Sequence, residues 1–192
     1  MNKFDVYTYG PCITVFQVDD DLRKRLLDEG NKSREKNLDF RNELAGNIES
    51  EFYYENYDWF VSDFAKYVDY YSQSLVTHLR GQAITSWKLD KLWINYMKAN
   101  EYNPPHSHKG DLSFVIYLDV PEEIKKEKNE HNHAGAGVIS FDYGQEMPLS
   151  INRLAYHPKT SDAIIFPSWL THHVHSFKSP VERISVSGNI FL

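Results

Sequence analysis

The sequence predicts an α+β chain in which N-terminal helices support a C-terminal double-stranded β-helix, or jelly roll. Helical periodicity is confined to the first 85 residues, whereas short apolar segments separated by turn residues follow from there on. Such a run of strands without intervening helices is typical of an antiparallel sandwich or jelly roll. With 192 residues, of which 41% are apolar, the chain suits one globular domain over 1–192. We expect 1–85 to be the helical support and 86–192 the β-core.

The N-terminal part predicts one strand and two helices. Thr14 to Val18 alternates as a strand does, and the three aspartates at 19–21 are typical of the first turn of a helix, which we expect to end near Lys36. A second helix is predicted from Trp59 to Leu79. Its apolar residues recur at three- and four-residue steps, so they form one aromatic face that is expected to pack on a sheet.

The remainder of the chain predicts six short strands. They are Lys91 to Tyr96, Leu112 to Leu118, Gly137 to Phe141, Ala163 to Phe166, His173 to Phe177 and Arg183 to Phe191. Asn103-Pro104-Pro105, Tyr143-Gly144 and Ser179-Pro180 are read as breaks between them. The charged segment Glu122 to Glu130 is expected to be a solvated loop or a short helix.

Composition limits the kinds of ligand that the protein is expected to bind and the cellular compartment in which it is expected to act. A formal net charge of -6 disfavours nucleic acid as the main ligand, because proteins that bind nucleic acids must neutralise the negative charge of the phosphates. Cys12 is the single cysteine, so an intramolecular disulfide is impossible and a reducing, cytoplasmic setting is expected. Met1 to Gly10 lacks the apolar centre of a signal peptide, and no apolar stretch approaches the ~20 residues that cross a bilayer.

Histidines carry the strongest chemical signal, since eight of the nine lie after residue 100. His106 and His108 are two residues apart on a segment expected to be extended, which turns both rings to one face, where they can bind one metal ion. His131 and His133 have the same spacing but lie between charged and glycine-rich stretches, which favours a surface loop. His157, beside Pro158, is read as a loop residue.

A third histidine returns about 65 residues after the first pair. An apolar strand beginning near Asp162 turns at Pro167 and leads to His172, as a jelly roll would to complete a metal triad. Asp162 is expected to start a tight turn and His173 to alternate away from the metal, although the sequence leaves the choice between His172 and His173 open.

Arg183 opens the last predicted strand, and Ser185 shares its face. Arginine presents a planar fork that binds a carboxylate through two hydrogen bonds, and a nearby hydroxyl can complete the clamp. A redox metal beside this pair predicts a pocket for a small carboxylic acid.

The stretch from about 87 to 192 resembles the iron(II)/2-oxoglutarate-dependent oxygenases, in particular a prolyl-hydroxylase-like group of bacterial and phage proteins. The resemblance depends on Trp93-Ile94-Asn95, Pro105-His106-Ser107-His108 with Leu112-Ser113 and Tyr117-Leu118, Asp162 through Val174, and Arg183-Ile184-Ser185. It implies that His106 and His172 hold iron and that Arg183 binds the distal carboxylate of 2-oxoglutarate. Tyr117 and Ser185 would assist, with Asn95 as a further contact to the co-substrate. The implied reaction consumes O2 and 2-oxoglutarate, hydroxylates a C–H bond and releases succinate and CO2.

One position departs from the pattern of this family. Two residues after its first histidine the family usually has Asp or Glu, which completes a set of two histidines and one carboxylate. This chain has His108 there, so either the site has three histidines or Asp111 supplies the carboxylate. The shared face of His106 and His108 favours His108.

Other functions stay open at this stage. A three-histidine iron or zinc site could act without 2-oxoglutarate, as in thiol-oxidising cupins or hydrolases, and a jelly roll could be a non-catalytic binding module. Arg183 and Ser185 favour the oxygenase, because the alternatives need no carboxylate clamp. Analogy with prolyl hydroxylases suggests a peptide or protein prolyl substrate. The acidic, tyrosine-containing stretch Glu49 to Asp58 could line a peptide site or form a homodimer contact.

Overall fold

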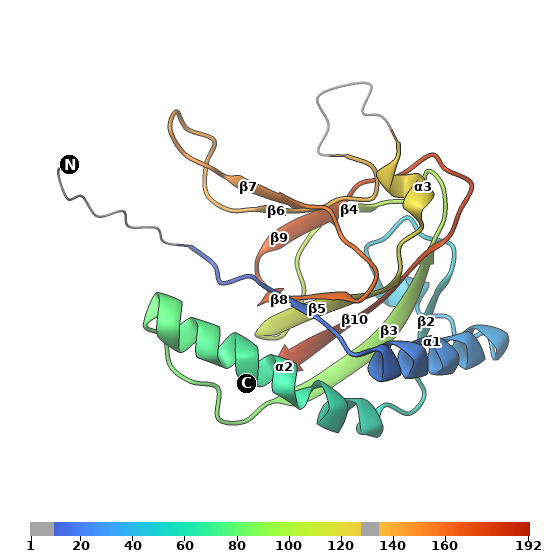
Figure 1. Ribbon diagram of the computed structural model, residues 1–192, viewed down its shortest axis with the longest axis horizontal. Helices are drawn as coiled ribbons and strands as arrows, with labels where there is room; N and C mark the ends of the chain where they lie inside the picture. Colours follow the sequence, from blue (N-terminus) through green and yellow to red (C-terminus); the bar gives the residue numbers. More distant parts are fainter. Residues whose placement is uncertain (1–9, 128–134) are drawn as a thin grey trace.

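Two antiparallel sheets face each other, and helices cover the outer side of the larger one (Figure 1). The computed structural model describes residues 10–127 and 135–192. The larger sheet has the strand order β1-β8-β5-β10-β3-β2 and the smaller one β4-β9-β6-β7. The larger sheet comprises β1 (Thr14–Gln17), β8 (Asp162–Pro167), β5 (Leu112–Asp119), β10 (Arg183–Phe191), β3 (Lys88–Met97) and β2 (Glu51–Tyr53). The smaller comprises β4 (Asn103–His106), β9 (Thr171–Val174), β6 (Ile139–Asp142) and β7 (Arg153–Tyr156).

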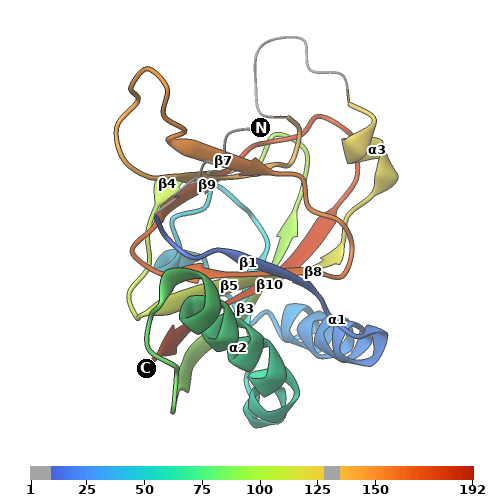
Figure 2. The same ribbon diagram turned by 60° about the vertical axis from the view of Figure 1, so that its left-hand side comes forward.

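Two long helices lie beneath the larger sheet, as Figure 2 shows. They are α1 (Asp20–Glu35) and α2 (Asp58–Leu79), and two short helical segments, η1 (Arg41–Glu43) and α3 (Glu122–Lys125), complete the set in the described residues. The aromatic face predicted for α2 is buried: Phe60 and Phe64 are fully covered, and both rings pack against Phe114 of β5. Asp19 occupies the N-cap position of α1 without capping it, because its carboxylate binds Lys66 and Tyr67 of α2 instead.

The apolar side chains form two clusters, one on each side of the larger sheet. The first lies between that sheet and the helices, and the second lies between the two sheets and includes Ile139, Phe141 and Phe166. Alternation along the strands explains this division, because successive side chains point to opposite faces. The predicted α+β jelly roll is therefore confirmed.

Several predicted boundaries are wrong. Asn103 to Pro105, expected to be a break, belongs to β4, which pairs with β9. Proline is tolerated there because β4 is an edge strand and its missing N–H groups cost no interior ladder bond. The strand expected at 173–177 is β9, which begins earlier, at Thr171. Strands β2 and β7 were not expected.

The segment Glu122 to Glu130 begins with the short helix α3, whereas its end and the pair His131 and His133 lie outside the described residues. Trp169 is 57% exposed beside Tyr143, so it packs in neither sheet. Within the described ranges, no helix is both long enough and apolar enough to cross a lipid bilayer.

Candidate metal centre and adjoining pocket

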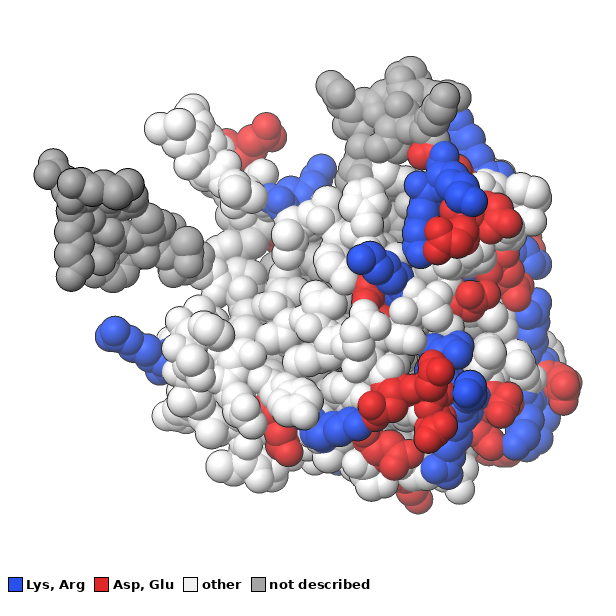
Figure 3. Space-filling view, viewed as in Figure 1, with Lys and Arg blue, Asp and Glu red and all other residues white. Residues whose placement is uncertain are grey.

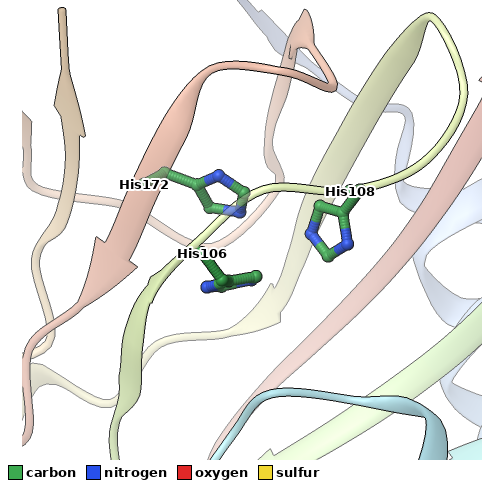
Figure 4. A group of neighbouring side chains, drawn as sticks. All are labelled: His106, His108 and His172. Atoms are coloured by element: carbon green, nitrogen blue, oxygen red, sulfur yellow. The ribbon is translucent and has the colours of Figure 1, made fainter.

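Three histidine rings meet between the two sheets (Figure 4). His106 ends β4, His108 lies just after it, and His172 lies on β9. Antiparallel pairing places His106 directly opposite His172, and the i, i+2 spacing brings in His108. One ring nitrogen from each residue lies within 4.8 Å of the others, which is a spacing that a single metal ion can bridge.

Backbone carbonyls fix the tautomers of two of these histidines. His106 Nδ1 is 2.7 Å from the carbonyl oxygen of Pro104, and His172 Nδ1 is 3.0 Å from that of Leu170. A carbonyl oxygen only accepts hydrogen bonds, so each Nδ1 carries the hydrogen and each Nε2 keeps a free lone pair. Hydrogen bonds of this kind orient imidazoles for metal binding.

The environment keeps the three rings neutral. Burial lowers the pKa of His172 to about 3 and that of His108 to about 4, and it also lowers the pKa of His106. His106 further disfavours protonation of His108 and His172, and His108 that of His172, because a second positive charge nearby would be repelled. Phe166 and Trp93 pack on the cluster and contribute to this burial. Neutral imidazole is the form that binds metal ions.

Arg183 lies in the pocket that adjoins the histidines. Its side chain is 3% exposed and has no acidic partner among the described residues. Nη1 donates to the carbonyl of Gly137 at 2.7 Å and Nη2 lies 2.8 Å from Met97 Sδ, whereas Nε has no partner. Burial without an anion lowers the pKa of the guanidinium. An unpaired buried cation is costly, so this position suits a ligand carboxylate.

A row of polar residues crosses the larger sheet beside Arg183. Asn95 on β3 is aligned with Ser185 on β10, and Ser185 is aligned with Tyr117 on β5. The Asn95 amide lies 3.5 Å from the Ser185 hydroxyl, and the Arg183 guanidinium lies 5.4 Å from the centre of the Tyr117 ring. All four residues line the pocket, so the structure brings together the residues that the sequence singled out for the co-substrate.

The remaining sequence candidates have other partners. Asp111 accepts a hydrogen bond from the backbone of Leu192 and is not part of the histidine cluster. His173 points to Asp142, with 3.4 Å between Nδ1 and Oδ2. Asp162 accepts hydrogen bonds from Tyr156 and from the backbone of Lys159, as expected for a residue that fixes a turn.

The sequence reasoning did not identify Glu51, an acid, as a residue of this pocket. Glu51, on the edge strand β2, is 2% exposed and lines the pocket, although only the broader stretch Glu49 to Asp58 had been considered for a peptide site. The alternation of buried Phe52 with exposed Tyr53 was too short a signal to predict a strand there.

Comparison with models of protein families shows the family to which the chain belongs. Residues 91–189, more than half of the chain, match the family model described as "Putative 2OG-Fe(II) oxygenase". The chain belongs to this 2-oxoglutarate/iron(II) oxygenase family. It is therefore a 2-oxoglutarate-dependent oxygenase, an oxidoreductase class that uses Fe(II), 2-oxoglutarate and O2. No curated protein matches the sequence.

Solved structures of this oxygenase class share the fold. A prolyl-4-hydroxylase from Pseudomonas putida is 13% identical with a TM-score of 0.55, and the match covers 92% of this chain and 90% of that one. The viral collagen prolyl hydroxylase of Paramecium bursaria Chlorella virus-1, solved as a 2-oxoglutarate complex, is 14% identical with a TM-score of 0.57, covering 93% and 94%. A Trichoplax adhaerens prolyl hydroxylase, solved with a hypoxia-inducible-factor peptide, is also 14% identical with a TM-score of 0.57, covering 95% and 83%.

Proposed function

We propose that this oxygenase holds Fe(II) through His106, His108 and His172 and hydroxylates a C–H bond of a peptide substrate. The observation that carries the proposal is the convergence of three neutral imidazoles beside a buried arginine that lacks an anion. The donor set fits the metal, because two of the free Nε2 atoms are fixed by the backbone and imidazole suits iron.

The pocket also fits 2-oxoglutarate. Arg183 would bind the distal carboxylate through its Nε atom, which lacks a partner. The hydrogen bond from Nη1 to the carbonyl oxygen of Gly137 fixes the position of the guanidinium. The hydroxyls of Ser185 and Tyr117 would donate to the same carboxylate. Burial raises the pKa of Tyr117 to about 12, so its hydroxyl keeps its proton and stays a donor.

The chain's own residues contribute orientation and exclusion of water. When bound, the iron and 2-oxoglutarate supply the oxidising chemistry that activates O2. Trp93, Phe166 and Val115 line the pocket and keep it largely apolar on the metal side. Strands β3, β5 and β10 are central in the larger sheet, so the residues they carry are held rigidly.

The substrate in this proposal is a peptide with a prolyl residue, by analogy with the prolyl hydroxylases that share the fold. Nucleic acid is not favoured. On the face drawn in Figure 3, Lys and Arg alternate with Asp and Glu over α1 and α3, so this face has no continuous basic surface.

Anaerobic titration of the Fe(II)-loaded protein with 2-oxoglutarate tests the proposal. We expect a visible charge-transfer band, which requires the metal and the co-substrate in one site. Arg183→Lys should keep stoichiometric iron yet bind 2-oxoglutarate roughly 10- to 100-fold more weakly, because lysine cannot form the two-bond clamp. Arg153→Lys, on the surface at β7, is the matched control and should behave as the wild type. Bound iron without any band would instead favour a three-histidine protein that acts without 2-oxoglutarate.

A further inference from the structure

Glu51 is a buried acid without a complete set of partners. It lies on β2 at the edge of the larger sheet, lines the same pocket as the histidines, and its Oε2 atom has no hydrogen-bond partner. Leaving a carboxyl oxygen buried and unpaired destabilises a fold, so such a group is expected to serve a ligand. Residue 51 also precedes the region 91–189 that matches the family, whereas the histidines and Arg183 lie within it.

A second acceptor without a partner lies next to Glu51. Asn95 is directly opposite Glu51 in the β2–β3 pair, a register at which Cβ atoms are about 4.5–5.5 Å apart. The Asn95 amide nitrogen faces Ser185 and Ser187, while its Oδ1 atom has no partner. The pocket therefore presents two neighbouring oxygen atoms, Glu51 Oε2 and Asn95 Oδ1, that have no hydrogen-bond partner.

When Glu51 is ionised, neither co-substrate can satisfy these two acceptors. At neutral pH 2-oxoglutarate carries two carboxylates and a keto group, and O2 has no hydrogen, so both lack hydrogen-bond donors. Arg183 Nε, by contrast, is a donor that a carboxylate satisfies. The remaining molecule in the reaction is the substrate to be oxidised, which must supply the donor.

The charges around Glu51 indicate whether the donor on the substrate is charged. Burial is the largest cause of the raised pKa of Glu51, and the charge of Glu101, which is 8% exposed, raises it further. The carboxylate oxygens of Glu101 accept the backbone N–H groups of Glu49 and Lys98. Arg41 is the cation that acts on Glu51, but its guanidinium already forms two hydrogen bonds with the Asp39 carboxylate. Burial is the main reason that the pKa of Glu51 rises to about 8, and a cation entering the pocket would reverse this. This side of the pocket is thus short of positive charge.

We infer that Glu51, together with Asn95, recognises a protonated amine on the substrate, next to the carbon that is hydroxylated. The inference rests on the proposed oxygenase function and narrows its substrate. The ring nitrogen of a prolyl residue inside a peptide bears neither hydrogen nor charge, whereas a proline with a free amino group is a secondary ammonium. Among peptides, an N-terminal prolyl residue therefore fits the pocket better than an internal one.

A binding experiment with paired probes tests this inference. The protein is loaded with Mn(II) and 2-oxoglutarate, to prevent turnover, and titrated at pH 7.5 with pyrrolidine and L-prolinamide, followed by ligand-observed NMR. Tetrahydrofuran and N-acetyl-L-prolinamide are the uncharged counterparts. We expect the amines to bind the wild type and to bind Glu51→Gln roughly 10- to 100-fold more weakly, with the uncharged compounds weak for both proteins.

Glu49→Gln is the matched control, since Glu49 is exposed and two residues away, and it should leave amine binding unchanged. Glu51→Gln should keep wild-type affinity for metal and 2-oxoglutarate. If it loses 2-oxoglutarate binding, Glu51 serves the co-substrate and the inference is overturned while the oxygenase function stands. Failure of both amines to bind, or equal binding of the uncharged compounds, also overturns it. Loss of the charge-transfer band in the wild type would instead count against the oxygenase function itself.

Discussion

At the scale of single residues, atoms without partners indicate where ligands bind. In the described part of the chain, five buried side-chain atoms lack a hydrogen-bond partner, and three of them, on Glu51, Asn95 and Arg183, line one pocket. Native folds rarely leave buried polar atoms unpaired, so their concentration in one pocket points to function rather than to imperfect packing.

The two adjacent histidines of β9 allow a direct test at this scale. His172→Ala should remove most of the metal affinity, because His172 faces His106 and His108 in the cluster. His173→Ala should retain the metal, since His173 points to Asp142. Equilibrium dialysis with Mn(II), followed by elemental analysis, measures both. The opposite order of effects would make His173 the third ligand.

Glu51 predicts a pH dependence of stability without any ligand. Its pKa rises from 4.5 to about 8 on folding, so between these values the folded state binds more protons than the unfolded state. The stabilisation is complete below about pH 4.5 and is lost as the pH rises through 8. Relative to Glu51→Gln, the wild type should therefore lose roughly 1–4 kcal/mol of unfolding free energy across this window. Urea denaturation at several pH values measures the difference.

The pH dependence of the stability difference between the wild type and Glu51→Gln also depends on the groups around Glu51. Burial is the main cause of its raised pKa; Glu101 and Asp39 raise the pKa further and Arg41 lowers it. The neutral rings of His106 and His108 line the same pocket. A constant difference between the two proteins from pH 5 to 8 would show that the Glu51 carboxyl is already ionised in the folded state.

At the scale of elements, β10 joins the site to the helical layer. Its first residues, Arg183 and Ser185, face the pocket, while Gly188 further along leaves room for Phe114, on which α2 packs. A Cβ atom at 188 would lie 2.5 Å from Phe114 Cζ and 2.7 Å from the carbonyl oxygen of Lys91. The backbone oxygen has little freedom to move, so glycine is required at this position.

Substitution of Gly188 tests this contact. Gly188→Ala should lower the free energy of unfolding by about 1–3 kcal/mol, because overpacking strains the sheet and displaces the ring beneath α2. Gly81→Ala is the control, since its added methyl group would meet nothing closer than 3.5 Å. Chemical denaturation of the wild type and the two variants measures their free energies of unfolding. Equal stability of the two variants would contradict the predicted clash.

At the scale of the whole molecule, the helices and the larger sheet share one apolar cluster. Leu26 of α1 and Phe64 of α2 belong to the same cluster as Ile94 and Ile116 of the sheet. We therefore propose that 1–192 is a single domain, in which residues 1–85 are needed for the β-core to fold. The pocket supports this, because Glu51 and Ile48 contribute to its wall from the N-terminal part.

Removing residues 1–85 tests the single-domain proposal. The fragment 86–192 exposes the apolar outer face of the larger sheet, so we expect it to aggregate or to unfold without a cooperative transition. The full chain should unfold in one transition with equal calorimetric and van't Hoff enthalpies. A fragment that melts cooperatively with native strand content would show two domains.

The sequence by itself determined the fold class and predicted His106, His108, His172 and Arg183 as site residues, while it left open the choices between His108 and Asp111 and between His172 and His173. Periodicity and the i, i+2 spacing of His106 and His108 are local properties, readable along one strand or helix. His172 and Arg183 are far away in the sequence, so their prediction needed the jelly-roll topology and the family resemblance as well. Tertiary structure decided what depends on pairing between distant segments. The strand β4 forms despite its prolines because β9 lies beside it, and Glu51 enters the pocket because β2 pairs with β3. A three-residue edge strand has almost no periodic signal of its own, so only the assembled sheet could place an acid there.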